Sequence, residues 1–351
     1  MGIPLLDFRA YAQGNETEKA RFCQDLRQTL ATYGFARLCG HNISRATIRE
    51  LFSQAQRFFA LTTAVKAKIA HGPAPNPHRG WSAVGKEKLA ELPKLNAARD
   101  GERGVYDVRE SLDLGSEQDT VTPNLWVPEA DLPGFREFMG DFYEQCHSMH
   151  ILLLEAVALS FSLDPQCLAR QCQKDKTDNP SELRLNHYPA TRAASLAAGN
   201  KTMRISPHTD FGLITLLFQD SVGGLEVERQ ELEHRGCYIP VEAPASADDD
   251  ADDDFSSSTM ILNVGDCLER WTNGLLPSAN HRVTLPPRLK NHQDPDAIAP
   301  DRYSVAYFGK PDRQASVCSL PEFLLGEGDV PKFTEPMTAW EYNQSRLMHT
   351  Y

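Results

Sequence analysis

The stretch Ser206-Pro207-His208-Thr209-Asp210-Phe211-Gly212 places an imidazole and a carboxylate two residues apart. In an extended backbone, side chains at positions i and i+2 point to the same side of the strand. His208 and Asp210 are therefore suited to bind one metal ion together. An H-x-D pattern by itself is weak evidence, so the prediction depends on what the rest of the chain supplies.

A third candidate ligand is present in Asn280-His281-Arg282-Val283. His281 is far along the chain, but it is beside strand-like sequence that could lie across a barrel from His208. Two neutral imidazoles and one carboxylate on one face of a metal leave positions open for other ligands, which is the arrangement of non-haem Fe(II) oxygenases. The sequence thus predicts a metal centre formed by His208, Asp210 and His281.

The remaining histidines have simpler interpretations. A second H-x-D pattern, His292-Gln293-Asp294, lies in a polar stretch flanked by prolines, and only His349 follows it. We predict that it does not bind metal. His147 and His150 are three residues apart on an expected helix, and His187 is in an expected strand. We expect these three side chains at surface or packing positions.

A possible carboxylate site occurs in Arg302-Tyr303-Ser304-Val305-Ala306-Tyr307-Phe308. Strand alternation places Arg302 and Ser304 on one face. An arginine stays charged and can bind a carboxylate through two hydrogen bonds, and the hydroxyl adds a third donor. Considered alone, Arg302 at the start of a strand would more often point to solvent. Beside a metal centre, the pair instead predicts a binding site for a carboxylate ligand.

The order of expected elements indicates the fold class. Apolar residues recur at helical spacing in residues 17–33, 45–60 and 134–163, whereas residues 71–132 are rich in loop-forming residues. Short β-like runs follow, at residues 183–188, 213–218, 224–227, 259–264 and 303–308. Helices followed by such strands predict a mainly β protein with α, in which a barrel or jelly roll is supported by helices.

Composition excludes some classes of partner. The chain has 36 Lys and Arg against 48 Asp and Glu, a net charge of -12, which opposes binding to nucleic acid. Its most apolar stretch, residues 151–163, is too short to span a membrane, and we expect no targeting segment at the start. Eight scattered cysteines form no C-x-x-C pair. We expect a soluble, cytoplasmic protein, with the acidic segment 248–254 as a solvated loop.

With these pieces in order, the sequence resembles the Fe(II)/2-oxoglutarate-dependent dioxygenases of the isopenicillin N synthase-like superfamily, over nearly the whole chain. The motifs that carry the resemblance follow in the family's order: Ile3-Pro4-Leu5-Leu6-Asp7-Phe8, Tyr33-Gly34-Phe35, His78-Arg79-Gly80-Trp81, Asn186-His187-Tyr188-Pro189, His208-Thr209-Asp210, Asn263-Val264-Gly265-Asp266, His281-Arg282-Val283 and Arg302-x-Ser304. Their joint occurrence is highly specific. The acidic segment lengthens the interval between Asp210 and His281 without removing a ligand.

The resemblance implies a distorted double-stranded β-helix, or jelly roll, with N-terminal and central supporting helices. It implies that His208, Asp210 and His281 bind Fe(II), with no catalytic residue beyond the metal centre. Arg302 and Ser304 would bind the distal carboxylate of the cosubstrate 2-oxoglutarate, and Tyr188 and Asn186 would add polar contacts to it. Tyr188 has an equally good interpretation as a buried tyrosine with a local hydrogen bond. We expect an N-terminal region at 1–175, the oxygenase core at 176–325 and a C-terminal segment at 326–351.

The implied activity is oxidation of a small organic molecule with 2-oxoglutarate and O₂, by hydroxylation, desaturation or ring rearrangement. The closest resemblance is to fungal enzymes that tailor secondary metabolites. Two alternatives stay open: an oxidase like isopenicillin N synthase, which consumes no 2-oxoglutarate, and a small-molecule receptor without turnover. The sequence leaves the substrate and the oligomeric state open. Candidates for the pocket walls are Tyr106, Phe211, Leu213 and Phe308.

Overall fold

The computed structural model of the 351-residue chain describes residues 2–72, 79–86, 106–172, 178–196, 202–244, 259–290, 294, 296–326 and 328–347. The acidic segment 248–254, His78, His292 and His349 lie outside these residues, as does the side chain of Tyr106. The predictions made for them stay predictions.

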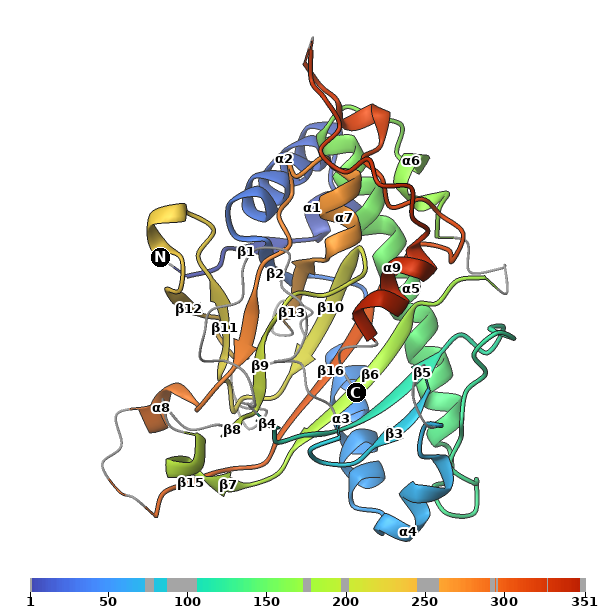
Figure 1. Cartoon of the computed structure of the whole chain (residues 1–351), viewed down its shortest axis with the longest axis vertical. Coiled ribbons are helices and arrows are strands. Elements are labelled where there is room, and N and C mark those ends of the chain that lie inside the picture. Colours follow the sequence, from blue (N-terminus) through green and yellow to red (C-terminus); the bar gives the residue numbers. More distant parts are fainter. Residues whose placement is uncertain are drawn as a thin grey trace.

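Two β-sheets form the centre of the molecule (Figure 1). Among the described residues, eight strands form the larger sheet, in the order β1 (Leu5–Asp7), β2 (Phe35–Cys39), β13 (Met260–Val264), β10 (Ile214–Gln219), β16 (Arg302–Phe308), β6 (Glu182–Tyr188), β5 (Glu110–Gly115) and β3 (Gly80–Ser82). Four form the smaller sheet, in the order β12 (Tyr238–Pro240), β11 (Leu225–Glu228), β14 (His281–Val283) and β9 (Ile205–His208). Two short pairs join β7 (Thr191–Arg192) to β15 (Ile298–Ala299) and β4 (Tyr106–Asp107) to β8 (Thr202–Met203).

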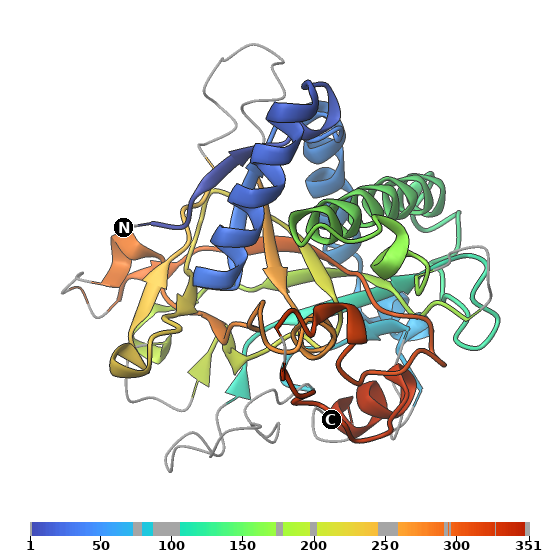
Figure 2. The same cartoon turned by 90° about the horizontal axis from the view of Figure 1, so that it is seen from above.

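Three long helices support the larger sheet: α2 (Glu16–Tyr33), α3 (Arg45–Phe59) and α5 (Phe135–Ser160). Figure 2 shows α2 in blue and α5 in green on one side of the strands, whereas the C-terminal helix α9 (Ala339–Leu347), in red, lies on the other side. The shorter helices are α1 (Arg9–Ala12), α4 (Thr63–Lys66), α6 (Gln166–Ala169), α7 (Asp266–Trp271) and α8 (Pro287–Lys290). No helix in the described ranges has the length and apolar character needed to cross a membrane.

Strand alternation decides which side chains meet the helices and which face the other sheet. On β6, Leu183 and Leu185 are fully buried in the main core beneath the helices. Arg184, Asn186 and Tyr188 alternate with them and line a cavity on the opposite face. Burial of the apolar face against α2, α3 and α5 therefore fixes the register that presents the polar face to the cavity.

The turn at Tyr33-Gly34-Phe35 links the first long helix to the sheet. Gly34 ends α2 in the left-handed conformation, with φ of 65°, and β2 begins at the next residue. A Cβ at this position would lie 2.6 Å from the Cβ of Ala279, so only glycine fits here. The three predicted helices correspond to α2, α3 and α5. The division at residues 175 and 325 stays a prediction, and strands from both sides of residue 175 share the larger sheet.

Candidate active site

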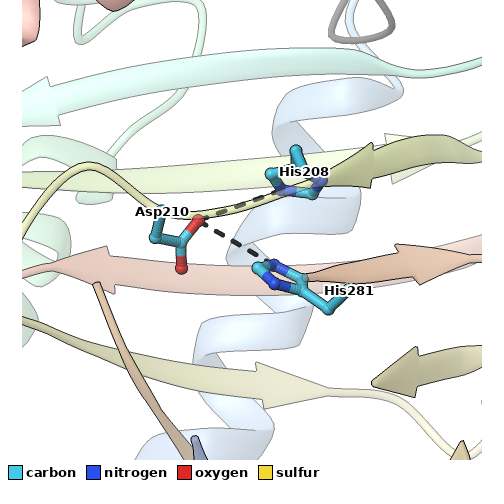
Figure 3. A group of neighbouring side chains, drawn as sticks. All are labelled: His208, Asp210 and His281. Atoms are coloured by element: carbon cyan, nitrogen blue, oxygen red, sulfur yellow. Dashed lines mark ion pairs between the residues drawn. The ribbon is translucent and has the colours of Figure 1, made fainter. Parts of the chain in front are cut away.

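His208, Asp210 and His281 converge at the edge of the smaller sheet (Figure 3). His208 ends β9 and His281 begins β14, and the two residues are direct partners in antiparallel register. The expectation that His281 lies across the barrel from His208 is wrong, because the two histidines are on neighbouring strands. Asp210 follows His208 by two residues, and its Oδ1 lies 3.9 Å from the Nε2 of each histidine. Ligand atoms from all three residues lie within 4.8 Å of one another.

Backbone carbonyls fix which nitrogen each imidazole presents. The Nδ1 of His208 lies 2.9 Å from the Ser206 carbonyl oxygen, and the Nδ1 of His281 lies 3.0 Å from that of Ala279. Since a carbonyl only accepts, each Nδ1 must carry a proton and donate it, so in the neutral imidazole the free lone pair is on Nε2. Burial chiefly, and then the neighbouring His281, lowers the pKa of His208 to about 3. The Nε2 atoms of both histidines face Asp210, as metal ligation requires.

Two hydrogen bonds orient the carboxylate of Asp210. Its Oδ2 accepts from the Thr215 hydroxyl and from the Asn263 amide, both at 2.6 Å, so Oδ1 remains on the side of the histidines. Burial alone would raise the pKa of Asp210, but His281, His208 and these two hydrogen bonds together lower it. The carboxylate is therefore ionised and held in one orientation. In the part of the chain that the structure describes, this is the one group of three such side chains close enough to share a metal ion.

Glycines permit the close packing behind Asp210. A Cβ on Gly212 would lie 2.4 Å from the Gly309 carbonyl oxygen, and one on Gly265 would lie 2.4 Å from the Gly212 carbonyl oxygen. The backbone N–H of Asp266 donates to the Asp210 carbonyl at 2.7 Å. The start of α7 thus holds the loop that carries Asp210, which gives Asn263-Val264-Gly265-Asp266 a structural role.

Arg302 and Ser304 face the same cavity from the larger sheet. Arg302 is only 1% exposed, which rules out the solvent-facing interpretation. Its Nη2 donates to Gln219 Oε1 at 2.9 Å and its Nη1 donates to the Ser304 hydroxyl at 3.3 Å. The Nε is buried and has no hydrogen-bond acceptor among the described residues. A buried guanidinium with a donor to spare, next to a hydroxyl, fits a carboxylate ligand.

Tyr188 and Asn186 flank this pair on β6. Tyr188 is opposite Arg302 in register, its ring centroid lies 4.8 Å from the guanidinium, and its hydroxyl lies 3.5 Å from that of Ser304. Asn186 is opposite Ser304 and accepts from the Nη1 of Arg109 at 2.8 Å. Because arginine can only donate, Asn186 presents its oxygen to Arg109 and directs its NH₂ elsewhere. All four predicted cosubstrate contacts therefore line one cavity with the metal triad.

Sequence reasoning located only part of the cavity lining. Phe211 and Phe308 line it as expected, whereas Leu213 is fully buried in the main core. Among the lining residues that were missed are Arg109, Lys310 and Leu347. They come from segments outside the recognised motifs. Arg109 precedes β5, Lys310 follows β16, and Leu347 ends α9, so only the folded chain brings them together.

His147, His150 and His187 are not part of the metal triad. His147 and His150 are buried between α5 and β16, with His147 Nδ1 at 2.8 Å from the Tyr307 hydroxyl. His187 stacks on Tyr303, with ring centroids 4.7 Å apart. His147 and His150 are packed in the protein interior, and His187 combines packing with hydrogen bonds to Glu110 and Asp301.

Comparison with known proteins defines the class. The family model described as the 2OG-Fe(II) oxygenase superfamily matches residues 180–311, and the model described as non-haem dioxygenase in morphine synthesis N-terminal matches residues 3–129. The chain is 48% identical to "2-oxoglutarate-dependent dioxygenase frbA" of Dothideomycetidae sp. (strain 11243), with 100% of this chain and 98% of that protein covered. It is also 48% identical to "Proline hydroxylase buaE" of Petromyces alliaceus, with both chains covered completely.

A solved structure agrees. A full-length Neurospora crassa protein, crystallised in complex with alpha-KG and thymine, superposes with a TM-score of 0.79 at 30% identity, over 98% of this chain and 96% of that chain. The chain therefore belongs to the 2OG-Fe(II) oxygenase superfamily. It is a 2-oxoglutarate-dependent dioxygenase with a jelly-roll core, and it uses Fe(II), 2-oxoglutarate and O₂. The predicted family, fold class and cofactors are confirmed.

Proposed function

We propose that this dioxygenase hydroxylates a free cyclic amino acid of the L-proline type in fungal secondary metabolism. The observation that carries the proposal is the convergence of a His-Asp-His triad and a buried Arg302–Ser304 pair on one cavity. The name of the relative from Petromyces alliaceus, a proline hydroxylase that matches over both full lengths, supports the substrate. A small cyclic amino acid also suits a cavity whose walls include both cations and the apolar residues Phe211, Phe308 and Leu347.

In this proposal His208, Asp210 and His281 hold Fe(II), which supplies with 2-oxoglutarate and O₂ the power to oxidise a substrate C–H bond, with release of succinate and CO₂. The protein's own residues orient the metal-binding side chains and the cosubstrate, and they keep water from the reacting C–H bond. Two backbone carbonyls keep the Nδ1 protons in place, and Thr215 and Asn263 keep Asp210 Oδ1 on the side of the imidazoles. Arg302 and Ser304 bind the distal carboxylate of 2-oxoglutarate, and Tyr188 and Asn186 add polar contacts.

Helix α9 contributes to closing the cavity. Arg346 donates from Nη2 to the Thr209 hydroxyl at 3.2 Å, and its guanidinium lies 5.1 Å from the ring centroid of Phe211. These contacts fix α9 against the loop that carries Asp210, and Leu347 then reaches the cavity. An apolar side chain at this position keeps water from the reacting C–H bond.

The test is a product assay with the Fe(II)-loaded protein, 2-oxoglutarate and O₂. With L-proline, we expect a product heavier by one oxygen atom and one succinate per product. Thymine, a ring without a carboxylate, serves as the comparison substrate. Absence of succinate that depends on L-proline would contradict the substrate. Oxidation without succinate would favour the oxidase alternative, and no O₂ consumption with any oxidisable ligand would favour the receptor.

We further propose that the enzyme acts in the cytosol and does not bind nucleic acid. All eight cysteines lie in the described part of the chain and none is in a disulfide, which suits a reducing compartment. The net charge of -12 supports the second point. Cell fractionation and a DNA-binding assay at low salt test the two points separately.

A further inference from the structure

The ring of His208 takes its orientation from Ser206, two residues earlier on β9. The Nδ1 of His208 donates to the Ser206 carbonyl oxygen at 2.9 Å. The proline at position 207 restricts the residue before it to extended backbone conformations, which limits the directions that this carbonyl can take. Whatever fixes the rest of Ser206 therefore also fixes the acceptor that orients His208.

Asp107 holds Ser206 from a segment that lies 99 residues earlier in the chain. One oxygen of its carboxylate, Oδ1, accepts from the Ser206 N–H at 2.9 Å and from the Ser206 hydroxyl at 2.7 Å. Asp107 is only 1% exposed, and Ser206 is completely buried. Hydrogen bonds accepted by a carboxylate are among the stronger ones, and burial keeps water from competing for them. Asp107 thus fixes both the backbone and the side chain of Ser206.

Two short strands keep Asp107 in this position. Strand β4 pairs in parallel with β8, and Asp107 is directly opposite Met203 (Figure 1). The Val108 N–H then donates to the Met203 carbonyl oxygen at 2.8 Å. Met203 comes shortly before Ser206 in the chain, so this pairing brings the carboxylate of Asp107 to Ser206. A segment that precedes α5 is thereby connected to the metal triad.

We propose that Asp107 is a positioning residue of the metal centre, which acts through Ser206 to keep the Nε2 of His208 directed at the metal position. The inference rests on the proposed role of His208 as a metal ligand and adds a residue outside the metal triad. An imidazole that is held in one orientation loses less conformational freedom when it binds a metal ion, so the metal binds more tightly.

The test measures the affinity of the metal-free protein for Mn(II), by anaerobic titration in competition with a chelator. We expect Asp107→Ala to weaken Mn(II) binding by about 10- to 100-fold, as loss of an outer partner of a metal-binding histidine does. Asp107→Asn, whose side-chain oxygen can still accept both hydrogen bonds, should retain most of the affinity. Ser206→Ala removes one of the two bonds and should weaken binding about fivefold. His208→Ala, which removes the ligand itself, should cause the largest loss.

The matched control is Thr122→Val. It likewise removes a hydroxyl that donates to a buried carboxylate, that of Asp119 at 2.6 Å. Urea unfolding of the metal-free proteins measures the free energy that each substitution costs the fold, and Thr122→Val should lose stability without losing Mn(II) affinity.

Mn(II) affinity equal to that of wild type in Asp107→Ala and Ser206→Ala, whatever their stability, overturns the positioning role. If Asp107→Ala does not fold, Ser206→Ala decides alone. An equal loss of affinity in Thr122→Val also overturns the role, because the effect would then be general. Unchanged affinity in His208→Ala overturns the proposed metal ligand and, with it, this inference.

Discussion

The two walls of the cavity are built in different ways. On the smaller sheet, His208 and Asp210 are two residues apart, and His281 is placed opposite His208 by one register of β9 and β14. On the wall formed by the larger sheet, the four cations of the described lining come from three segments: Arg109 precedes β5, Arg184 is on β6, and Arg302 and Lys310 are on β16 and just after it. The difference indicates that short-range spacing places two of the three residues of the triad, whereas tertiary structure alone assembles the cationic wall of the cavity.

The largest effect is expected from loss of a metal-binding residue beside the smaller sheet. Asp210→Ala removes the one anionic ligand of the triad, so iron should no longer bind in the productive geometry. We expect activity to fall by about a thousandfold or more, since the metal supplies several kcal/mol of rate enhancement. Iron content and succinate formation measure the loss. His292→Ala, in the second H-x-D pattern, is the control, and a matching loss there would contradict the assignment of the triad.

A smaller effect is expected when the residues that orient Asp210 are changed. Thr215→Val and Asn263→Leu each remove a 2.6 Å hydrogen bond to Oδ2 while nearly keeping the side-chain volume. Loss of such an orienting partner weakens metal affinity by about 10- to 100-fold. Competition with a metal chelator measures this change, and Thr32→Val on the exposed face of α2 is the control. Unchanged metal affinity in both site variants would show that Asp210 binds metal equally well without these two hydrogen bonds.

Ser304→Ala tests the contribution of a single hydroxyl group to 2-oxoglutarate binding on the larger sheet. The hydroxyl lies next to Arg302, and its loss should remove one hydrogen bond to 2-oxoglutarate while the guanidinium remains. A single hydrogen bond contributes about 1 kcal/mol, so we expect the KM for 2-oxoglutarate to rise about fivefold. The iron affinity should not change. A rise in the KM for the oxidised substrate instead would place the cosubstrate elsewhere.

The smallest effect is expected for His187. This residue is on β6, and its side chain is on the face of the larger sheet opposite to the cavity. Burial lowers its pKa, but hydrogen bonds to Glu110 at 2.8 Å and Asp301 at 2.9 Å outweigh burial, and its pKa is raised. A raised pKa stabilises the fold fully below the unfolded value of about 6.5, and this stability is lost as pH rises through the folded pKa. In urea unfolding, the free energy of unfolding of wild type should exceed that of His187→Gln by a larger amount at acidic pH than at alkaline pH. A difference independent of pH would refute this origin.

The fold and the metal centre were accessible from the sequence because their signals are local. Helical spacing located α2, α3 and α5, and alternation located β6 and β16 together with the shared face of Arg302 and Ser304. The neighbouring position of His281 was missed, because strand order does not follow chain order. Arg109 and Leu347 were missed as well, since nothing in their local sequence distinguishes a residue that lines a cavity from any other buried residue.

The most direct test of the account is to add 2-oxoglutarate, without oxygen, to the Fe(II)-loaded protein and to follow the visible metal-to-ligand charge-transfer band. The band reports 2-oxoglutarate bound to iron. It therefore shows whether the metal triad and Arg302, from the two sheets, bind the same ligand. The account predicts a band in wild type that requires far more 2-oxoglutarate in Arg302→Ala, by about 2–5 kcal/mol of binding free energy. An iron-loaded wild type without the band, or the same 2-oxoglutarate requirement in both proteins, would contradict it.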